Sequence, residues 1–178
     1  MMDTATAARI VDGRLVGAPV RFRRVTTDSR ALAAGDLFVA LQGAPVSVAL
    51  LFVADRAPAL AFTLIAVPDP LAALGRLAAH WRRQFALPVA VVVGSNGKTT
   101  VKEMLARILR AAFGAEGVLA TEGNLNNAIG LPLTLLRLTA AHRAAAVELG
   151  MSHRGETREL AAIAKPTIVV VNNAQREH

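Results

Sequence analysis

Residues 89 to 100 read Val89-Ala90-Val91-Val92-Val93-Gly94-Ser95-Asn96-Gly97-Lys98-Thr99-Thr100. The first five residues are an apolar run typical of a buried strand, and a glycine-rich loop follows directly. Beyond the loop, apolar residues recur at helical spacing and end near Gly114. They are Val101, Met104, Leu105, Ile108, Leu109 and Ala112. A strand, a glycine-rich loop and an amphipathic helix in this order predict a phosphate-binding P-loop.

The chemistry of this loop depends on its backbone and on two side chains. Glycines allow backbone N–H groups to point at phosphate oxygens, and the following helix presents its positive end to them. Lys98 is expected to reach the β and γ phosphates of ATP, and the Thr99 hydroxyl is expected to bind a bridging Mg²⁺. The predicted nucleotide-binding residues are Gly94, Ser95, Asn96, Gly97, Lys98, Thr99 and Thr100.

The loop departs from the general G-x-x-x-x-G-K-[ST] spacing in one place. That pattern places a glycine at position 92, where this sequence has Val92. The alternative interpretation is a glycine turn beside a lone lysine. The preceding strand and the following helix favour the P-loop, because the phosphate-binding mechanism requires both.

The rest of the second half continues an α/β pattern. Two continuous apolar runs, Ala144 to Leu149 and Thr167 to Val171, suit buried parallel strands. The segment between them predicts a helix from Gly155 to Ala164. Together with the P-loop unit, these elements predict a parallel sheet flanked by helices.

The first half predicts a smaller α/β domain. Alternating apolar residues and glycines predict a hairpin from Arg9 to Phe22, and Leu37 to Leu41 form a short apolar strand. Helical spacing predicts a helix from Leu71 to Phe85, and Pro88 follows its end. We therefore expect a domain boundary near residue 87. The fold class is α/β, with a small domain at residues 1–87 and a P-loop, parallel-sheet domain at residues 88–178.

Further site candidates lie near the predicted strand ends. Glu148 comes at the end of a strand, where open parallel sheets bind ligands, so its carboxylate is expected to bind Mg²⁺. A solvent-facing glutamate is the alternative. His178 follows the strand that ends at Val171 and is a third candidate for the metal, although a lone histidine is more often on the surface. Asn124, Asn126 and Asn127 can hydrogen-bond a polar substrate or act as turn formers and helix caps.

Composition excludes several classes of protein. The chain has no cysteine, so disulfides and thiolate metal sites are absent, which fits a cytoplasmic location. The start of the chain lacks the pattern of a signal peptide. Charged residues interrupt the apolar stretch from Val46 to Val67, so we expect no membrane segment. The net charge of +7 comes from scattered basic residues without interleaved aromatics, so we expect no nucleic-acid partner.

Several of these segments together resemble the Mur ligases of peptidoglycan synthesis. The P-loop is similar to the shortened loop of this family, which accounts for Val92. The similarity extends to Val101–Met104, Gly123–Thr134, Glu148–His153 and Asn172–His178. In the first domain, Thr27, Asp28, Ser29 and Arg30 with the following Gly35–Leu41 are similar to the family segment that binds the UDP-sugar. The segment from Pro45 to Ala66 departs from the family pattern.

The resemblance implies an ATP-dependent amide ligase that works through an acyl phosphate. The implied substrates are UDP-N-acetylmuramoyl-tripeptide and D-alanyl-D-alanine, with ATP and Mg²⁺, and Lys98, Glu148 and His178 as catalytic groups. A monomer is expected. Family members continue beyond the region that corresponds to residue 178, into the rest of the ATPase domain and a third domain. We therefore expect no turnover from these residues alone.

Two alternatives remain at the level of sequence. One is a sister ligase of the Mur or folylpolyglutamate synthetase type, against which the segment from Asn124 to Asn127 argues. The other is a nucleotide-binding module without ligase activity. Only a ligase forms ADP when both of its substrates are supplied.

Overall fold

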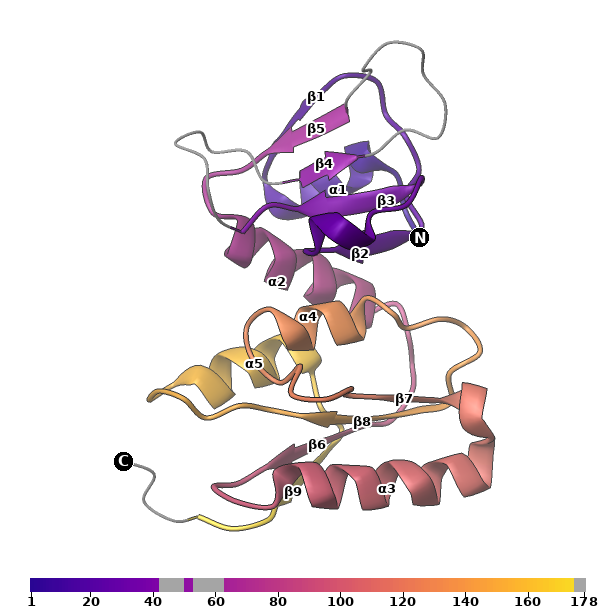
Figure 1. The fold of residues 1–178 in the computed structure, drawn as a ribbon, viewed down its shortest axis with the longest axis vertical. Helices are drawn as coiled ribbons and strands as arrows, with labels where there is room; N and C mark the ends of the chain where they lie inside the picture. The colour runs from indigo at the N-terminus through magenta and orange to yellow at the C-terminus, as the bar shows by residue number, and fades with distance from the viewer. Residues whose placement is uncertain (42–49, 53–62, 175–178) are drawn as a thin grey trace. The chain divides into compact units, whose positions relative to one another are not determined.

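The computed structural model describes residues 1–41, 50–52 and 63–174 (Figure 1). The chain divides into two compact units, Met1–Leu77 and Ala78–His178. None of the helices in these described ranges has the length and apolarity that crossing a bilayer requires. Most of the segment from Pro45 to Ala66, expected to be atypical, lies outside the described residues.

The first unit contains a five-stranded sheet. Its strands are ordered β1-β5-β4-β3-β2; β2 is parallel to β3, and the other pairs are antiparallel. The elements are α1 (Thr4–Val11), β1 (Arg14–Val16), β2 (Arg24–Thr26), the 3-10 helix η1 (Ser29–Ala31), β3 (Asp36–Val39), β4 (Leu50–Phe52) and β5 (Thr63–Ala66). The following helix, α2 (Pro70–Arg82), crosses the division between the units.

The predicted hairpin from Arg9 to Phe22 is wrong. The residues before Asp12 form α1, which begins where Asp3 Oδ1 accepts a hydrogen bond of 2.7 Å from Thr6 N. β1 then pairs with the distant β5, not with a neighbouring strand. Gly13 allows this close approach, because a Cβ there would lie 2.7 Å from Ile65 Cγ2. The glycine that suggested a turn instead serves packing against another strand.

The second unit is a parallel sheet with helices on both faces. The strand order is β7-β8-β6-β9 and every pair is parallel, with α3 on one face and α4 and α5 on the other (Figure 1). The elements are β6 (Val89–Val93), α3 (Lys98–Phe113), η2 (Ala115–Gly117), β7 (Val118–Ala120), α4 (Gly130–Leu135), β8 (Ala144–Glu148), α5 (Glu156–Ala164) and β9 (Ile168–Val171).

Most of the second unit agrees with the sequence predictions. β6, α3, β8, α5 and β9 are present within a residue or a few of the expected bounds. The α/β fold with a parallel P-loop sheet is therefore confirmed. β7 and α4 are not predicted from the sequence, because a three-residue strand and a six-residue helix are too short to show a period.

The division between the units falls earlier than the expected boundary near residue 87. It lies between Leu77 and Ala78, inside α2. The last turn of α2 bonds to the second unit: Trp81 Nε1 donates to Leu138 O at 3.0 Å, and Arg82 Nε donates to Ala164 O at 3.0 Å. Periodicity marks the end of a helix but not the unit against which each turn packs, so the sequence placed all of α2 in the first domain.

Candidate functional site

The carboxyl ends of β6 and β8 lie side by side in the second unit. Val92 is paired with Glu148 in the parallel ladder. β6 leads into α3 on one face of the sheet, whereas the chain after β8 reaches α5 on the opposite face (Figure 1). Neighbouring parallel strands whose connections leave to opposite faces open a crevice at their carboxyl ends, which is the usual ligand site of such sheets.

The glycine-rich loop needs glycine at two positions. Gly94 has a φ of 144°, and a Cβ there would lie 3.0 Å from Asn173 N. Gly97 has a φ of 74° at the start of α3, and its Cβ would lie 2.9 Å from Asn172 Nδ2. Both residues combine a left-handed backbone with close neighbours, so any side chain would distort the loop.

Two asparagines after β9 hold this loop from the side. Asn173 Oδ1 accepts from Asn96 N at 3.0 Å. The side chains of Asn172 and Asn173 both donate to Asn96 O, at 2.6 and 3.1 Å. This role of Asn172 and Asn173 is not predicted from the sequence. Paired amides directly after a strand were the available signal, but their partner lies 76 or 77 residues away.

Lys98 lies folded over the loop. Its Nζ donates to Gly94 O at 2.6 Å and to Ser95 O at 3.3 Å. These bonds keep the ammonium at the mouth of the loop and at the positive end of α3, where an anionic ligand would gain from both charges.

Glu148 and Thr99 meet at the crevice. Thr99 Oγ1 donates to Glu148 Oε2 at 2.9 Å, and Glu148 is only 2% exposed. Glu148 therefore lies beside the loop and does not face solvent, while its role as a Mg²⁺ ligand stays a prediction. Two neighbouring ligands of an octahedral Mg²⁺, each at about 2.1 Å, lie about 3 Å apart. The hydroxyl and the carboxylate thus fit this ion in type and in spacing.

The asparagine-rich segment serves partly as structure. Asn126 Nδ2 donates to Glu148 Oε1 at 2.8 Å, so it orients the carboxylate from the side opposite Thr99. Asn127 Oδ1 accepts from Ile129 N and Gly130 N at the start of α4, at 3.1 and 2.9 Å. Asn124 is exposed. A substrate role for Asn124, Asn126 and Asn127 stays a prediction.

The remaining metal candidate, His178, lies outside the described residues. Within the described ranges, no three His, Asp or Glu side chains gather into a metal-binding group. An open hollow of about 330 Å³ borders Thr99 and continues along α3 past Thr100, Glu103, Met104 and Arg107. It leaves room for a ligand beside the start of the helix.

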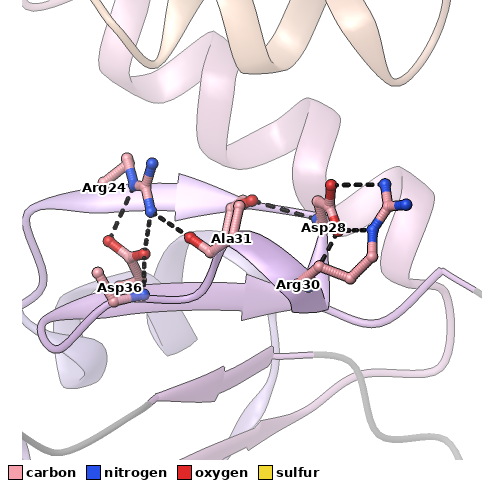
Figure 2. A network of polar contacts seen from close by, with 7 residues as sticks. Arg24, Asp28, Arg30, Ala31 and Asp36 are labelled. Carbon is pink, nitrogen blue, oxygen red and sulfur yellow. Dashed lines mark hydrogen bonds and ion pairs between the residues drawn. The ribbon is translucent and has the colours of Figure 1, made fainter.

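The residues expected to bind the UDP-sugar, Thr27 to Arg30, lie in the first unit, where Thr27 and Asp28 follow β2 and Ser29 and Arg30 begin η1. Figure 2 shows Asp28 and Arg30. Asp28 caps η1 through a hydrogen bond of 3.0 Å from Arg30 N, and it pairs with the Arg30 guanidinium at 2.9 Å. This arginine lowers the pKa of Asp28 to about 2. The side chain of Arg30 is 88% exposed, while Thr27 is half-buried and Ser29 is exposed. A ligand can therefore reach the Arg30 guanidinium.

A second carboxylate anchors this turn. The Asp36 side chain is 5% exposed; it accepts from Arg24 Nε at 3.0 Å and from Ala33 N at 2.9 Å, and it forms an ion pair with Arg24 Nη2 (Figure 2). The same guanidinium donates to Ala31 O at 2.7 Å. Asp36 and Arg24 together tie β2 and β3 to η1.

Asp36→Asn should destabilise the first unit at neutral pH and much less in acid. Arg24 lowers the pKa of Asp36, so the carboxylate contributes stability above its unfolded pKa of about 3.9 and loses it as pH falls through the folded value. We expect a loss of about 1 kcal/mol at pH 7, because Arg24 is half exposed. Urea unfolding followed by circular dichroism between about pH 7 and pH 2 measures this.

Asp12→Asn is the matched control for this pH dependence, since Asp12 is an exposed carboxylate at the end of α1. It should change stability by less than about 0.5 kcal/mol. A constant difference between Asp36→Asn and the unsubstituted protein down to pH 2 would contradict the assignment.

The loop, the parallel sheet and the acidic strand end define a P-loop nucleotide-binding protein. Residues 92–178 match the family model of the Mur ligase middle domain. Over 180 residues the chain is 39% identical to the UDP-N-acetylmuramoyl-tripeptide–D-alanyl-D-alanine ligase of Escherichia coli K12, covering 95% of this chain and 39% of that ligase. A ligase of the same name from Bacillus subtilis 168 is 35% identical, with 86% and 36% covered.

Solved structures agree with the sequence relatives. A crystal structure of MurF from Acinetobacter baumannii superposes with a TM-score of 0.80 at 32% identity, covering 99% of this chain and 41% of that one. MurF ligase from Thermotoga maritima, in complex with ADP, gives a TM-score of 0.67 at 29% identity over 85% of this chain and 37% of that one. The chain belongs to the Mur ligase family. It spans about two fifths of the length of the relatives that it matches.

Proposed function

We propose that this chain supplies the ATP-binding part of a ligase that joins D-alanyl-D-alanine to UDP-N-acetylmuramoyl-tripeptide. The observation that carries the proposal is the meeting of Lys98, Thr99 and Glu148 at the carboxyl edge of the parallel sheet. The names of the relatives support the choice of substrates, and the ADP complex of the T. maritima ligase supports the choice of nucleotide.

The chemistry of amide formation explains why such a site is useful. A carboxylate is a poor electrophile toward an amine, so it first attacks the γ-phosphorus of ATP, which gives an acyl phosphate and releases ADP. The amine then attacks the acyl carbon and releases phosphate. In the first step two anions, the carboxylate and the γ-phosphate, must approach each other. The Lys98 ammonium and the backbone N–H groups of the loop offset this repulsion and stabilise the transferring phosphoryl group. Mg²⁺ would supply further positive charge to offset that of the phosphates, and Thr99 and Glu148 are the described residues that would hold it.

The first unit is proposed to bind the UDP-sugar end of the substrate. The exposed Arg30 guanidinium supports this, because arginine pairs well with diphosphate oxygens. Of the three asparagines, Asn124 and Asn127 are exposed and Asn126 is half-buried, so the first two are the more accessible to a substrate. His178 as a third metal ligand, a cytoplasmic location and a monomeric state stay predictions from the sequence.

Calorimetric titration of the chain with ATP and magnesium tests the nucleotide site. We expect binding, and we expect Lys98→Ala to weaken it tenfold or more, roughly the worth of charge-assisted hydrogen bonds to phosphate. Arg83→Ala removes the same charge from an exposed residue near the amino end of β6, at the opposite edge of the sheet, and should bind as the unsubstituted chain does. Circular dichroism checks that each variant is folded.

The proposal fails if the folded chain does not bind ATP with magnesium, or if Lys98→Ala and Arg83→Ala bind equally well. Either result would mean that the loop does not act as a phosphate cradle here.

A further inference from the structure

A buried lysine lies one turn beyond Thr99 on α3. Lys102 is 0% exposed, although its side chain ends in an ammonium group. Such a charge is costly to bury unless it is paired and hydrogen-bonded. Lys102 Nζ donates to Thr121 O at 2.7 Å and forms an ion pair with Glu103. Because the ammonium is fully shielded, it cannot bind phosphate itself.

Thr121 connects this lysine to the end of β8. It directly follows β7 and is 1% exposed. Its backbone N donates to Ala146 O at 3.1 Å, and its Oγ1 accepts from Glu148 N at 3.0 Å. Its carbonyl accepts from Lys102. Thr121 is thereby fixed through all three of its polar groups, and two of these bonds reach β8.

The contacts form a closed circuit around Glu148. The carboxylate is held by Thr99 from α3, and the backbone N of the same residue is held by Thr121. Thr121 is held in turn by Lys102, three residues after Thr99 on α3. The helix α3 therefore positions the Thr99 hydroxyl directly and, through Lys102 and Thr121, the backbone of Glu148.

We propose that Lys102 and Thr121 are positioning residues that hold Glu148 at the correct distance from Thr99 for a magnesium ion. This rests on the proposed function, because it concerns the same nucleotide site. Mg²⁺ demands near-ideal octahedral geometry, so small displacements of a ligand weaken its binding. Residues that orient a metal ligand without touching the metal commonly affect metal affinity strongly.

The experiment measures how much magnesium tightens ATP binding. Dissociation constants for ATP are determined by calorimetry with EDTA and with saturating magnesium. The value in EDTA divided by the value in magnesium measures the coupling between the two ligands. Thr121→Val keeps the shape and the carbonyl but removes the hydroxyl that Glu148 N requires. We expect this ratio to fall about tenfold, while binding in EDTA stays close to that of the unsubstituted chain. Thr121→Ser keeps the hydroxyl and should restore the ratio.

Thr167→Val is the matched control. Thr167 Oγ1 also accepts from a backbone N–H, that of Val89 at 3.0 Å, but at the amino end of β6. The substitution Thr167→Val should alter thermal stability without changing the ratio of the two dissociation constants for ATP. Lys102→Met should lower the ratio as Thr121→Val does.

An unchanged ratio in folded Thr121→Val would overturn the proposal. This includes an equal loss of ATP binding with and without magnesium, which is the mark of a merely structural role. If the unsubstituted chain fails to bind ATP with magnesium, the proposed function falls and this inference falls with it.

Discussion

Gly130→Ala should destabilise the second unit by about 3 kcal/mol or more, a cost at the upper end for overpacking a core. A Cβ at this position would lie 2.4 Å from Leu125 Cα and 2.5 Å from Leu125 C. These are backbone atoms, so no change of rotamer relieves the overlap. Either α4 or the segment around Leu125 must move. Because Asn126 is the next residue, its hydrogen bond to Glu148 should be disturbed as well.

Urea unfolding followed by circular dichroism measures the loss for Gly130→Ala, and calorimetry measures its effect on ATP binding with magnesium. Gly123→Ala is the control in the same segment, because a Cβ there would meet nothing within 4 Å. Its φ of 54° should cost only about 1 to 2 kcal/mol. Equal destabilisation by the two substitutions would show that backbone conformation, and not the contact with Leu125, explains the glycine at 130.

Arg82→Met should destabilise the second unit by about 3 to 4 kcal/mol, because it leaves buried carbonyl groups without donors. Arg82 is 5% exposed. Its guanidinium donates to Ala164 O at 3.0 Å, to Phe85 O at 2.7 Å, and to Leu87 O and Lys165 O at 3.3 Å. It therefore ties the end of α5 to the segment that leads into β6. Methionine keeps much of the aliphatic packing, so the measured loss reports the hydrogen bonds.

Arg83→Met is the control for this prediction. Arg83 is the exposed neighbour of Arg82, and its substitution should change the free energy of unfolding by less than about 0.5 kcal/mol. Arg82→Lys retains a cation but cannot reach four acceptors at once, so it should lower the free energy of unfolding by an intermediate amount. A loss below about 1 kcal/mol for Arg82→Met would mean that water replaces the guanidinium at these carbonyls.

The secondary structure of the second unit could be predicted because its signals are local. The run from Val89 to Val93 is continuously apolar, and α3 has a clear helical period that ends at Gly114. The first unit was harder. Gly13 was interpreted as part of a hairpin turn, but its place is set by Ile65, which follows it by more than fifty residues and packs against it. Glycine marks turns and close packing alike, and only the fold distinguishes them.

Likewise, part of the candidate site is visible in the sequence and part depends on the fold. Gly94, Gly97 and Lys98 are adjacent in the chain, so their motif is visible in the sequence. The roles of Asn172 and Thr121 are not visible in the sequence, because each depends on a partner in another element.

The sequence was sufficient for the phosphate-binding loop, the parallel strands β6, β8 and β9, and the acidic residue at a strand end, since turn chemistry and periodicity act over a few residues. The tertiary structure alone decided which groups surround Glu148. Thr99, Asn126 and Thr121 lie 49, 22 and 27 residues from it in the chain. They meet because β8 lies between β6 and β7. That strand order results from packing across the whole unit, which no local pattern encodes.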